Sequence, residues 1–176
     1  NYDLQFRGDV TARRALANSL NIPSVEVLSK LGVDKTLEMA QRLGITTLQD
    51  PKNYGLSLVL GTGEVPLLEM TQAYQVLANE GFKNDLTTVL EITDKEGNII
   101  YAHTAKQESV VDSKYTFLIS SMLSDSKARS EIFGNVLNIS RVAAVKTGTS
   151  QSYKDSWTMG YTPSLVIGSW MGNNSG

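Results

Sequence analysis

The spacing of apolar residues changes along the chain, and helical spacing dominates the first eighty residues. Apolar positions three or four apart predict a first helix that Thr11 caps and that runs through Leu16 and Leu20. This helix is expected to stop near Asn21, because the residue before Pro23 is disfavoured in helical conformation. The same spacing predicts further helices over residues 24–31, 35–43, 66–78 and 113–122. Asp34 is predicted to cap the helix at 35–43, and Asp112 the helix at 113–122.

Strand-like patterns dominate the second half. Residues 87–93 and 98–102 flank the turn sequence Asp-Lys-Glu-Gly and are predicted to form a β-hairpin. Glycines bound the apolar segment 54–63, which is expected to be a buried loop or short strand. Three further strands are predicted as an antiparallel meander, over residues 141–147, 156–161 and 165–171. Helices segregated from an antiparallel sheet predict an α+β fold.

Composition excludes several kinds of chemistry. The 176 residues carry 16 Lys and Arg against 18 Asp and Glu, for a formal charge of −2, so no electrostatic footprint for nucleic acid is present. The chain contains no cysteine, which excludes disulfides, thiolate nucleophiles and Cys-ligated metals. Its one histidine, His103, argues against a His-rich metal site or a Ser-His-Asp triad. We therefore expect no metal and no cofactor, and any nucleophile would need another base, for which lysine is the candidate.

The two ends of the sequence suggest a piece of a larger protein. The chain begins without an initiator Met or a signal-like segment, and it stops just after an apolar strand-like run. We therefore expect residues 1–176 to be part of a longer chain.

The first motif that could carry chemistry follows the predicted strand at residues 142–145. A lysine directly after four apolar residues is unusual, because a solvated lysine normally belongs to an alternating strand. A glycine in such a strand lets a ligand approach the backbone closely, and an edge strand can bind an extended peptide by β-addition. The ammonium and two hydroxyls indicate a strip that binds a carboxylate, although a chance strand exit is the alternative. The motif consists of Lys146, Thr147, Gly148 and Thr149.

The second motif, Ser19-Leu20-Asn21, lies where the first helix is expected to end. Its hydroxyl and carboxamide could both point into a cleft. Taken alone, the motif is better explained by ordinary helix-end polarity, with Asn21 as a left-handed cap.

Together, the two motifs resemble a known signature. S-x-x-K, S-x-N and K-T-G motifs mark penicillin-binding proteins and related β-lactamases, and here K-T-G follows S-x-N by 127 residues, in the expected order. Residues 15–25 resemble the AL-x-x-S-x-N-x-P-x-V stretch of bifunctional (class A) penicillin-binding proteins. Residues 57–81 and 146–173 are similar to their SL-x-LG-x-x-E-V-x-PL…AY…AN-x-G and KTGT…DAW…GYTP…W-x-GN regions. The resemblance covers nearly the whole chain and implies a single partial transpeptidase domain over residues 1–176, with the penicillin-binding and serine β-lactamase-like fold.

One element of the family pattern is missing. The nucleophilic serine of this family lies in an S-x-x-K box upstream of S-x-N, but residues 1–18 contain no serine. An S-x-x-K string occurs at Ser124 to Lys127, between the other two motifs, where the family has a loop. We therefore expect the nucleophile, the first strand of the sheet and the closing C-terminal helix to lie outside these residues.

The resemblance implies a D,D-transpeptidase that cross-links peptidoglycan stem peptides by serine acyl transfer and is acylated by β-lactams. By position, Ser19 would relay a proton, Lys146 would provide positive charge, and Asn21 would bind the donor's side-chain amide. Thr147, Gly148 and Thr149 would bind the donor carboxylate and backbone, with the Thr149 N–H in the oxyanion hole.

The resemblance also implies where the parent protein acts and with what. The parent would be anchored at the extracytoplasmic face of the bacterial membrane, with a glycosyltransferase domain upstream. The alternatives are a D,D-carboxypeptidase or β-lactamase-like hydrolase, and a non-catalytic peptide-binding module of the same fold.

Overall fold

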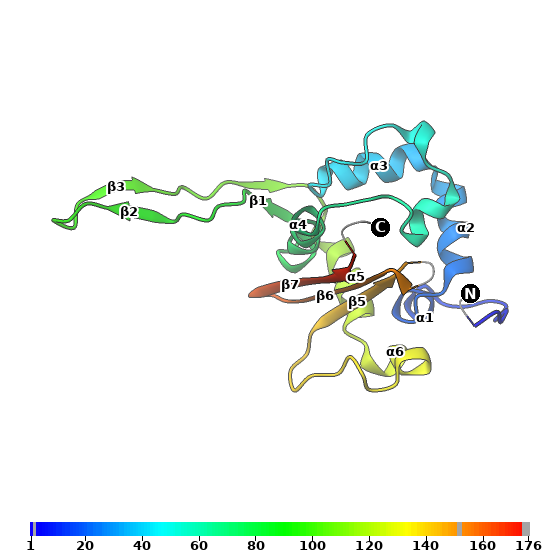
Figure 1. Ribbon diagram of the computed structural model, residues 1–176. Helices are drawn as coiled ribbons and strands as arrows, with labels where there is room; N and C mark the ends of the chain where they lie inside the picture. Colours follow the sequence, from blue (N-terminus) through cyan, green and yellow to red (C-terminus); the bar gives the residue numbers. More distant parts are fainter. Residues whose placement is uncertain (2, 151–152, 174–176) are drawn as a thin grey trace.

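The computed structural model describes residues 1, 3–150 and 153–173, which form a group of helices beside a small sheet (Figure 1). Among these residues, no helix combines the length and the apolar character that crossing a membrane requires. The helices are α1 (Ala12–Ala17), α2 (Asn21–Leu31), α3 (Val33–Arg42), α4 (Leu67–Ala78), α5 (Ser113–Leu123) and α6 (Ser126–Phe133), and two 3₁₀ turns, η1 (Pro51–Asn53) and η2 (Leu56–Leu60), lie between α3 and α4.

The sheet that carries the K-T-G motif is an antiparallel meander, as predicted. Strands β5 (Ala144–Thr149), β6 (Asp155–Thr162) and β7 (Leu165–Gly172) are ordered β5-β6-β7. β5 begins three residues later than predicted and continues through Thr149. No other described strand pairs with β5, so its outer edge is free within the described residues. The α+β class is thereby confirmed.

Helix α4 lies at the centre of the packing. Val76 is fully buried, and neighbouring α4 residues reach two different core clusters. Ala73 packs with Leu37 and nearby apolar residues under α3, whereas Tyr74 packs against the cluster around Tyr161 of β6. The Tyr74 and Tyr161 rings meet edge to face with centroids 6.1 Å apart. One helix therefore joins the helical part of the molecule to the sheet.

Helix α5 supports β5, the strand of the K-T-G motif. Leu123 of α5 and Ala144 of β5 are buried in the same cluster. Ser120 and the Tyr161 hydroxyl share a 2.9 Å hydrogen bond, which ties α5 to the middle strand as well. The predicted cap is confirmed, because the Asp112 side chain accepts from the Lys114 N–H at 3.0 Å.

The predicted position of the break between the first two helices is wrong. α1 ends at Ala17 and α2 already begins at Asn21, so Pro23 lies inside the first turn of α2. The first N–H groups of a helix have no partner within it, and a proline there costs no hydrogen bond. Only residues 18–20 separate the two helices, and this short turn contains Ser19.

Other predicted boundaries also differ. Segment 54–63 contains the 3₁₀ turn η2, with Leu56, Val59 and Leu60 exposed, and is neither a buried loop nor a strand. α3 begins at Val33, so Asp34 lies in its first turn instead of capping it. The sequence pattern missed α6, because its eight residues contain few apolar positions at helical spacing.

The predicted hairpin is present, but it is longer than expected. β2 (Glu91–Thr93) and β3 (Ile99–Ala102) pair near the tip, and β1 (Phe82–Asn84) and β4 (Gln107–Ser109) pair at the base. We call residues 82–109 the hairpin arm, which extends away from the rest of the molecule (Figure 1). Its exposed apolar side chains include Leu90, Ile99 and Ile100.

We expect Gly168→Ala to destabilise the fold. A Cβ at Gly168 of β7 would lie 2.3 Å from Thr71 Oγ1 and 2.9 Å from Met159 Cε, so these side chains must leave their present rotamers or α4 must move away from β7. Such overpacking costs about 1–3 kcal/mol, measurable by urea unfolding. Gly160→Ala in β6 is the matched control, because its nearest neighbour would be 3.8 Å away. An equal loss of stability in the two variants would contradict the packing argument.

Candidate active site

The two sequence motifs meet at one point. The Lys146 Nζ donates hydrogen bonds to the Ser19 Oγ and, at 2.6 Å, to the carbonyl oxygen of Thr147. Ser19 comes from the turn between α1 and α2, and Lys146 comes from the middle of β5. Residues that lie 127 positions apart therefore share a hydrogen bond.

The backbone at Ser19 adopts an unusual conformation. Its φ of +53° lies in the left-handed region, which residues other than glycine seldom occupy. The Ser19 N–H donates to the Leu16 carbonyl at 3.2 Å, and the Leu20 N–H donates to the Ala15 carbonyl at 2.9 Å, so the turn closes the end of α1. Leu20, the next residue of the turn, is buried. Strained residues of this kind persist where their surroundings hold them, often at functional sites.

The free edge of β5 presents backbone groups beside this contact. The Ser150 N–H donates to the Asp155 carbonyl at 3.0 Å, so residues 150 and 155 form a hydrogen-bonded pair. Such pairs alternate with non-hydrogen-bonded ones along an antiparallel ladder. The pairs of Thr149 with Ser156 and of Thr147 with Thr158 are then non-hydrogen-bonded. The N–H groups of Thr147 and Thr149 consequently point toward the free edge.

The Lys146 ammonium is largely buried. Desolvation lowers its pKa from 10.5 to about 8. Lys146 belongs to a strand that begins in the core at Ala144, and its position on this strand keeps the amine away from water. A lysine with this pKa can exchange a proton with a neighbouring hydroxyl near neutral pH.

The remaining predicted site residues lie close by in the fold. Asn21 is the first residue of α2, is half-buried, and has no hydrogen-bond partner for its side chain among the described residues. Strand alternation puts Lys146 and Gly148 on one face of β5 and the side chains of Thr147 and Thr149 on the other. What these four residues share is therefore the strand edge and not a face. A Cβ at position 148 would lie 3.4 Å from the Trp157 Cβ, so glycine gives this indole room.

Asp155 makes polar contacts at the end of β5, where the sequence predicts that it caps or pairs but does not identify its partners. The Asp155 N–H donates to the Ser150 Oγ at 2.8 Å, and the Asp155 carboxylate accepts from the Trp170 indole at 3.0 Å. The first bond joins the residue after β5 to the start of β6, and the second joins β6 to β7, next to the end of β5 that carries the Thr149 N–H. Asp155 and Trp170 belong to a stretch that resembles the family, but no local pattern pairs them. The intervening residues 151–152 lie outside the described residues.

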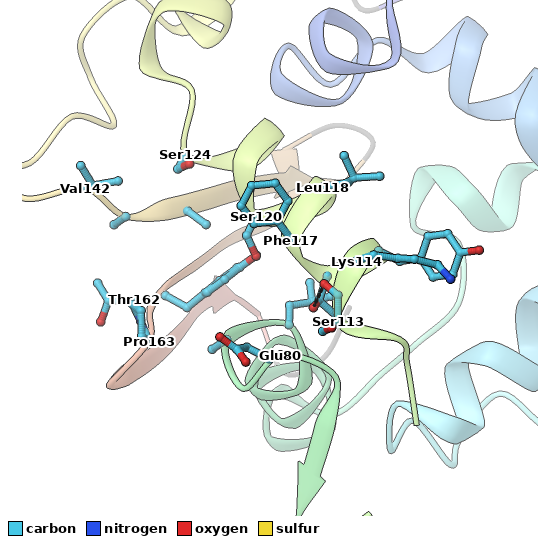
Figure 2. Close-up of a pocket in the computed structure, with 17 residues that line it drawn as sticks. Glu80, Ser113, Lys114, Phe117, Leu118, Ser120, Ser124, Val142, Thr162 and Pro163 are labelled. Atoms are coloured by element: carbon cyan, nitrogen blue, oxygen red, sulfur yellow. Dashed lines mark hydrogen bonds between the residues drawn. The ribbon is translucent and has the colours of Figure 1, made fainter. Parts of the chain in front are cut away.

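The S-x-x-K string in the middle of the chain lies elsewhere. Ser124 is the C-cap of α5, and it lines a cavity of about 770 Å³ between α4, α5 and the start of β5 (Figure 2). None of the residues of the Ser19–Lys146 contact lines this cavity. Lys127 is exposed, and in the described part of the chain its side chain makes no bond to Ser124. The described residues also contain no cluster of three or more potential metal ligands.

The buried ammonium predicts a specific dependence of stability on pH. Folded Lys146 loses its proton near pH 8, whereas an unfolded lysine keeps it to a pH of about 10.4. The unfolded state therefore binds more protons in this window, and the free energy of unfolding should rise by roughly 1–2 kcal/mol between pH 8 and pH 9.5. Urea unfolding at both pH values measures this change. Lys146→Met should abolish the rise, and a rise that persists in this variant would contradict the assignment.

Known proteins that are similar to this chain belong to one family. The family model of the penicillin binding protein transpeptidase domain matches residues 1–172. The chain is 34% identical over 177 residues to penicillin-binding protein 1A of Aquifex aeolicus, covering 98% of this chain and 23% of that protein. It is 33% identical over 177 residues to penicillin-binding protein 1B of Vibrio cholerae, covering 99% and 22%. The chain thus spans about a quarter of the length of these relatives.

Solved structures show the same fold. The PonA1 protein from Mycobacterium tuberculosis in complex with penicillin V superposes with a TM-score of 0.85 at 23% identity, covering 99% of this chain and 50% of that one. The arrangement of Ser19, Lys146 and the β5 edge is thus set in a known fold. The chain belongs to the penicillin-binding protein transpeptidase family, with class A proteins among its relatives.

Proposed function

We propose that these residues form the S-x-N and K-T-G half of a peptidoglycan D,D-transpeptidase site, within a single partial transpeptidase domain. The observation that carries this proposal is the hydrogen bond from the Lys146 ammonium to the Ser19 hydroxyl at the free edge of β5. The site has no histidine, so proton transfer must pass through serine and lysine, and a lysine with a pKa of about 8 suits that task. The nucleophilic serine of the proposal lies outside the 176 residues.

The proposed reaction is acyl transfer between stem peptides. The nucleophile's Oγ forms an ester bond with the penultimate D-Ala carbonyl, and the peptide bond to the terminal D-Ala breaks. The leaving nitrogen takes a proton through the Ser19 hydroxyl. An amine of a second stem peptide then attacks the ester, forms the cross-link and returns the serine. A β-lactam would acylate the same serine, as its ring resembles the donor.

The edge of β5 supplies the binding groups in this proposal. The Lys146 ammonium attracts the donor carboxylate, and Thr147 and Thr149 bind it or the adjoining backbone. The outward N–H of Thr149 serves as one oxyanion donor, and such donors contribute about 3–4 kcal/mol in comparable sites. Asn21 binds the donor's side-chain amide. An extended donor peptide can lie along the free edge as an added strand.

The proposal extends to the parent protein. We infer a longer chain with a glycosyltransferase domain, anchored at the extracytoplasmic face of the bacterial membrane, because the relatives are penicillin-binding proteins 1A and 1B of which this chain covers about a quarter.

A non-catalytic peptide-binding module is the second candidate for the chain by itself. It is favoured by residues 1–18, which contain no serine that could serve as the nucleophile.

Lysine substitutions test the site in the parent protein. Lys146→Ala should lower the rate of labelling by fluorescent penicillin about 100-fold or more, because the charge beside Ser19 is lost. Lys127→Ala is the matched control and should label at the wild-type rate, since this lysine is exposed and makes no contact with Ser19 or Lys146 among the described residues. Wild-type labelling of Lys146→Ala would refute its role.

Mass spectrometry of the 176-residue chain after incubation with a β-lactam tests whether the nucleophile lies outside these residues. No adduct is expected. A stable adduct would overturn the placement of the nucleophile and direct attention to Ser124 or another internal serine.

Release of D-Ala by the parent with and without an acceptor amine distinguishes transpeptidation from carboxypeptidation: the transpeptidase forms a cross-linked product when the amine is present.

A further inference from the structure

The residue before Ser19 carries a buried amide at the end of α1. Asn18 is the C-cap of α1 and is only 3% exposed. Ser19 itself makes one described side-chain hydrogen bond, to Lys146, and its left-handed backbone is costly for a serine. Besides the backbone hydrogen bonds of the turn, the Asn18 side chain contacts the end of α1.

The Asn18 amide makes three hydrogen bonds that join α1 to α6. Its Nδ2 donates to the Arg14 carbonyl at 3.0 Å and to the Ala128 carbonyl at 2.8 Å. Its Oδ1 accepts from the Ile132 N–H at 3.1 Å. Ala128 and Ile132 are four residues apart in α6, so the amide lies against one turn of that helix. Both donor hydrogens and the acceptor of this buried amide are satisfied.

Helix α6 is itself fixed to the support of β5. The buried Arg129 donates to the Leu123 carbonyl at the end of α5 at 2.8 Å. The Asp125 side chain caps α6 by accepting from the Ala128 N–H at 2.8 Å. Because α5 packs against β5, a continuous set of contacts runs from Asn18 through α6 and α5 to the strand of Lys146.

We propose that Asn18 is a positioning residue, which holds the end of α1 on α6 so that the Ser19 hydroxyl meets the Lys146 amine. This inference rests on the proposed function, but it concerns a residue outside the S-x-N and K-T-G motifs. Asn18 touches neither substrate nor reacting atoms and acts only through Ser19.

An ion pair between the same two helices, which we call the Glu131 clamp, provides the matched control for the Asn18 contacts. Arg14 of α1 pairs with Glu131 of α6 at 2.7 Å, and Arg7 pairs with the same carboxylate at 3.0 Å. This clamp is partly exposed and lies one helical turn before Asn18. Its loss should lower stability a little, without moving the turn that contains Ser19.

The test compares Asn18→Leu, Asn18→Asp and Glu131→Gln in the parent protein. Leu keeps the size without polar groups, and Asp keeps the acceptor for Ile132 but loses the donor to Ala128. We expect Asn18→Leu to lower the rate of acylation by fluorescent penicillin at least 10-fold, Asn18→Asp to show a smaller loss, and Glu131→Gln to stay within twofold of wild type. Thermal unfolding accompanies each measurement.

Titration of Lys146 by NMR gives a second readout that needs no acylation. Wild type and Glu131→Gln should titrate near pH 8, whereas both Asn18 variants should titrate at higher pH, because water reaches the amine once Ser19 moves away. The inference is overturned if the Asn18 variants keep the wild-type titration, or if Glu131→Gln changes it equally. Failure of the wild-type protein to be acylated would overturn the proposed function, while the titration still decides the role of Asn18.

Discussion

The site depends on the burial of one ammonium group. Lys146 extends from a strand that starts in the core, so its amine loses water and needs acceptors from the protein. It finds them in the Ser19 hydroxyl and the Thr147 carbonyl. The turn between α1 and α2 places the serine, and the bond from the Asp155 N–H to the Ser150 Oγ ties the end of β5 to β6. Burial of this ammonium lowers the free energy of unfolding, and it also lowers the pKa of the lysine to a value at which it can exchange a proton near neutral pH.

The two halves of the site come from different parts of the fold. The helical part provides Ser19, and the sheet provides Lys146. Helix α5 joins them, because it packs against β5 and its last residue, Leu123, accepts a hydrogen bond from Arg129 of α6. A relative movement of sheet and helices would therefore separate the serine from the lysine. The polar contacts between α1 and α6 resist that movement through the buried amide of Asn18.

Local features were predictable from the sequence, and long-range ones were not. The meander, the Asp112 cap and the lysine after four apolar residues follow from patterns within ten residues. The preference against helix before Pro23 failed because the first turn of a helix tolerates proline. The Ser19–Lys146 contact was expected only from the order of family motifs. Asn18 gave no signal, because nothing local distinguishes an amide that caps its own helix from one that bridges two helices.

The tip of the hairpin arm can unfold independently of the rest of the chain. Among the residues that the structure describes, its tip strands pair only with each other, and apolar side chains such as Leu90 and Ile100 are exposed instead of packed in a core. Two-stranded hairpins are only marginally stable by themselves. The tip can therefore unfold and refold many times without breaking a contact of α4, α5 or the meander, so its motions are not transmitted to the serine and the lysine.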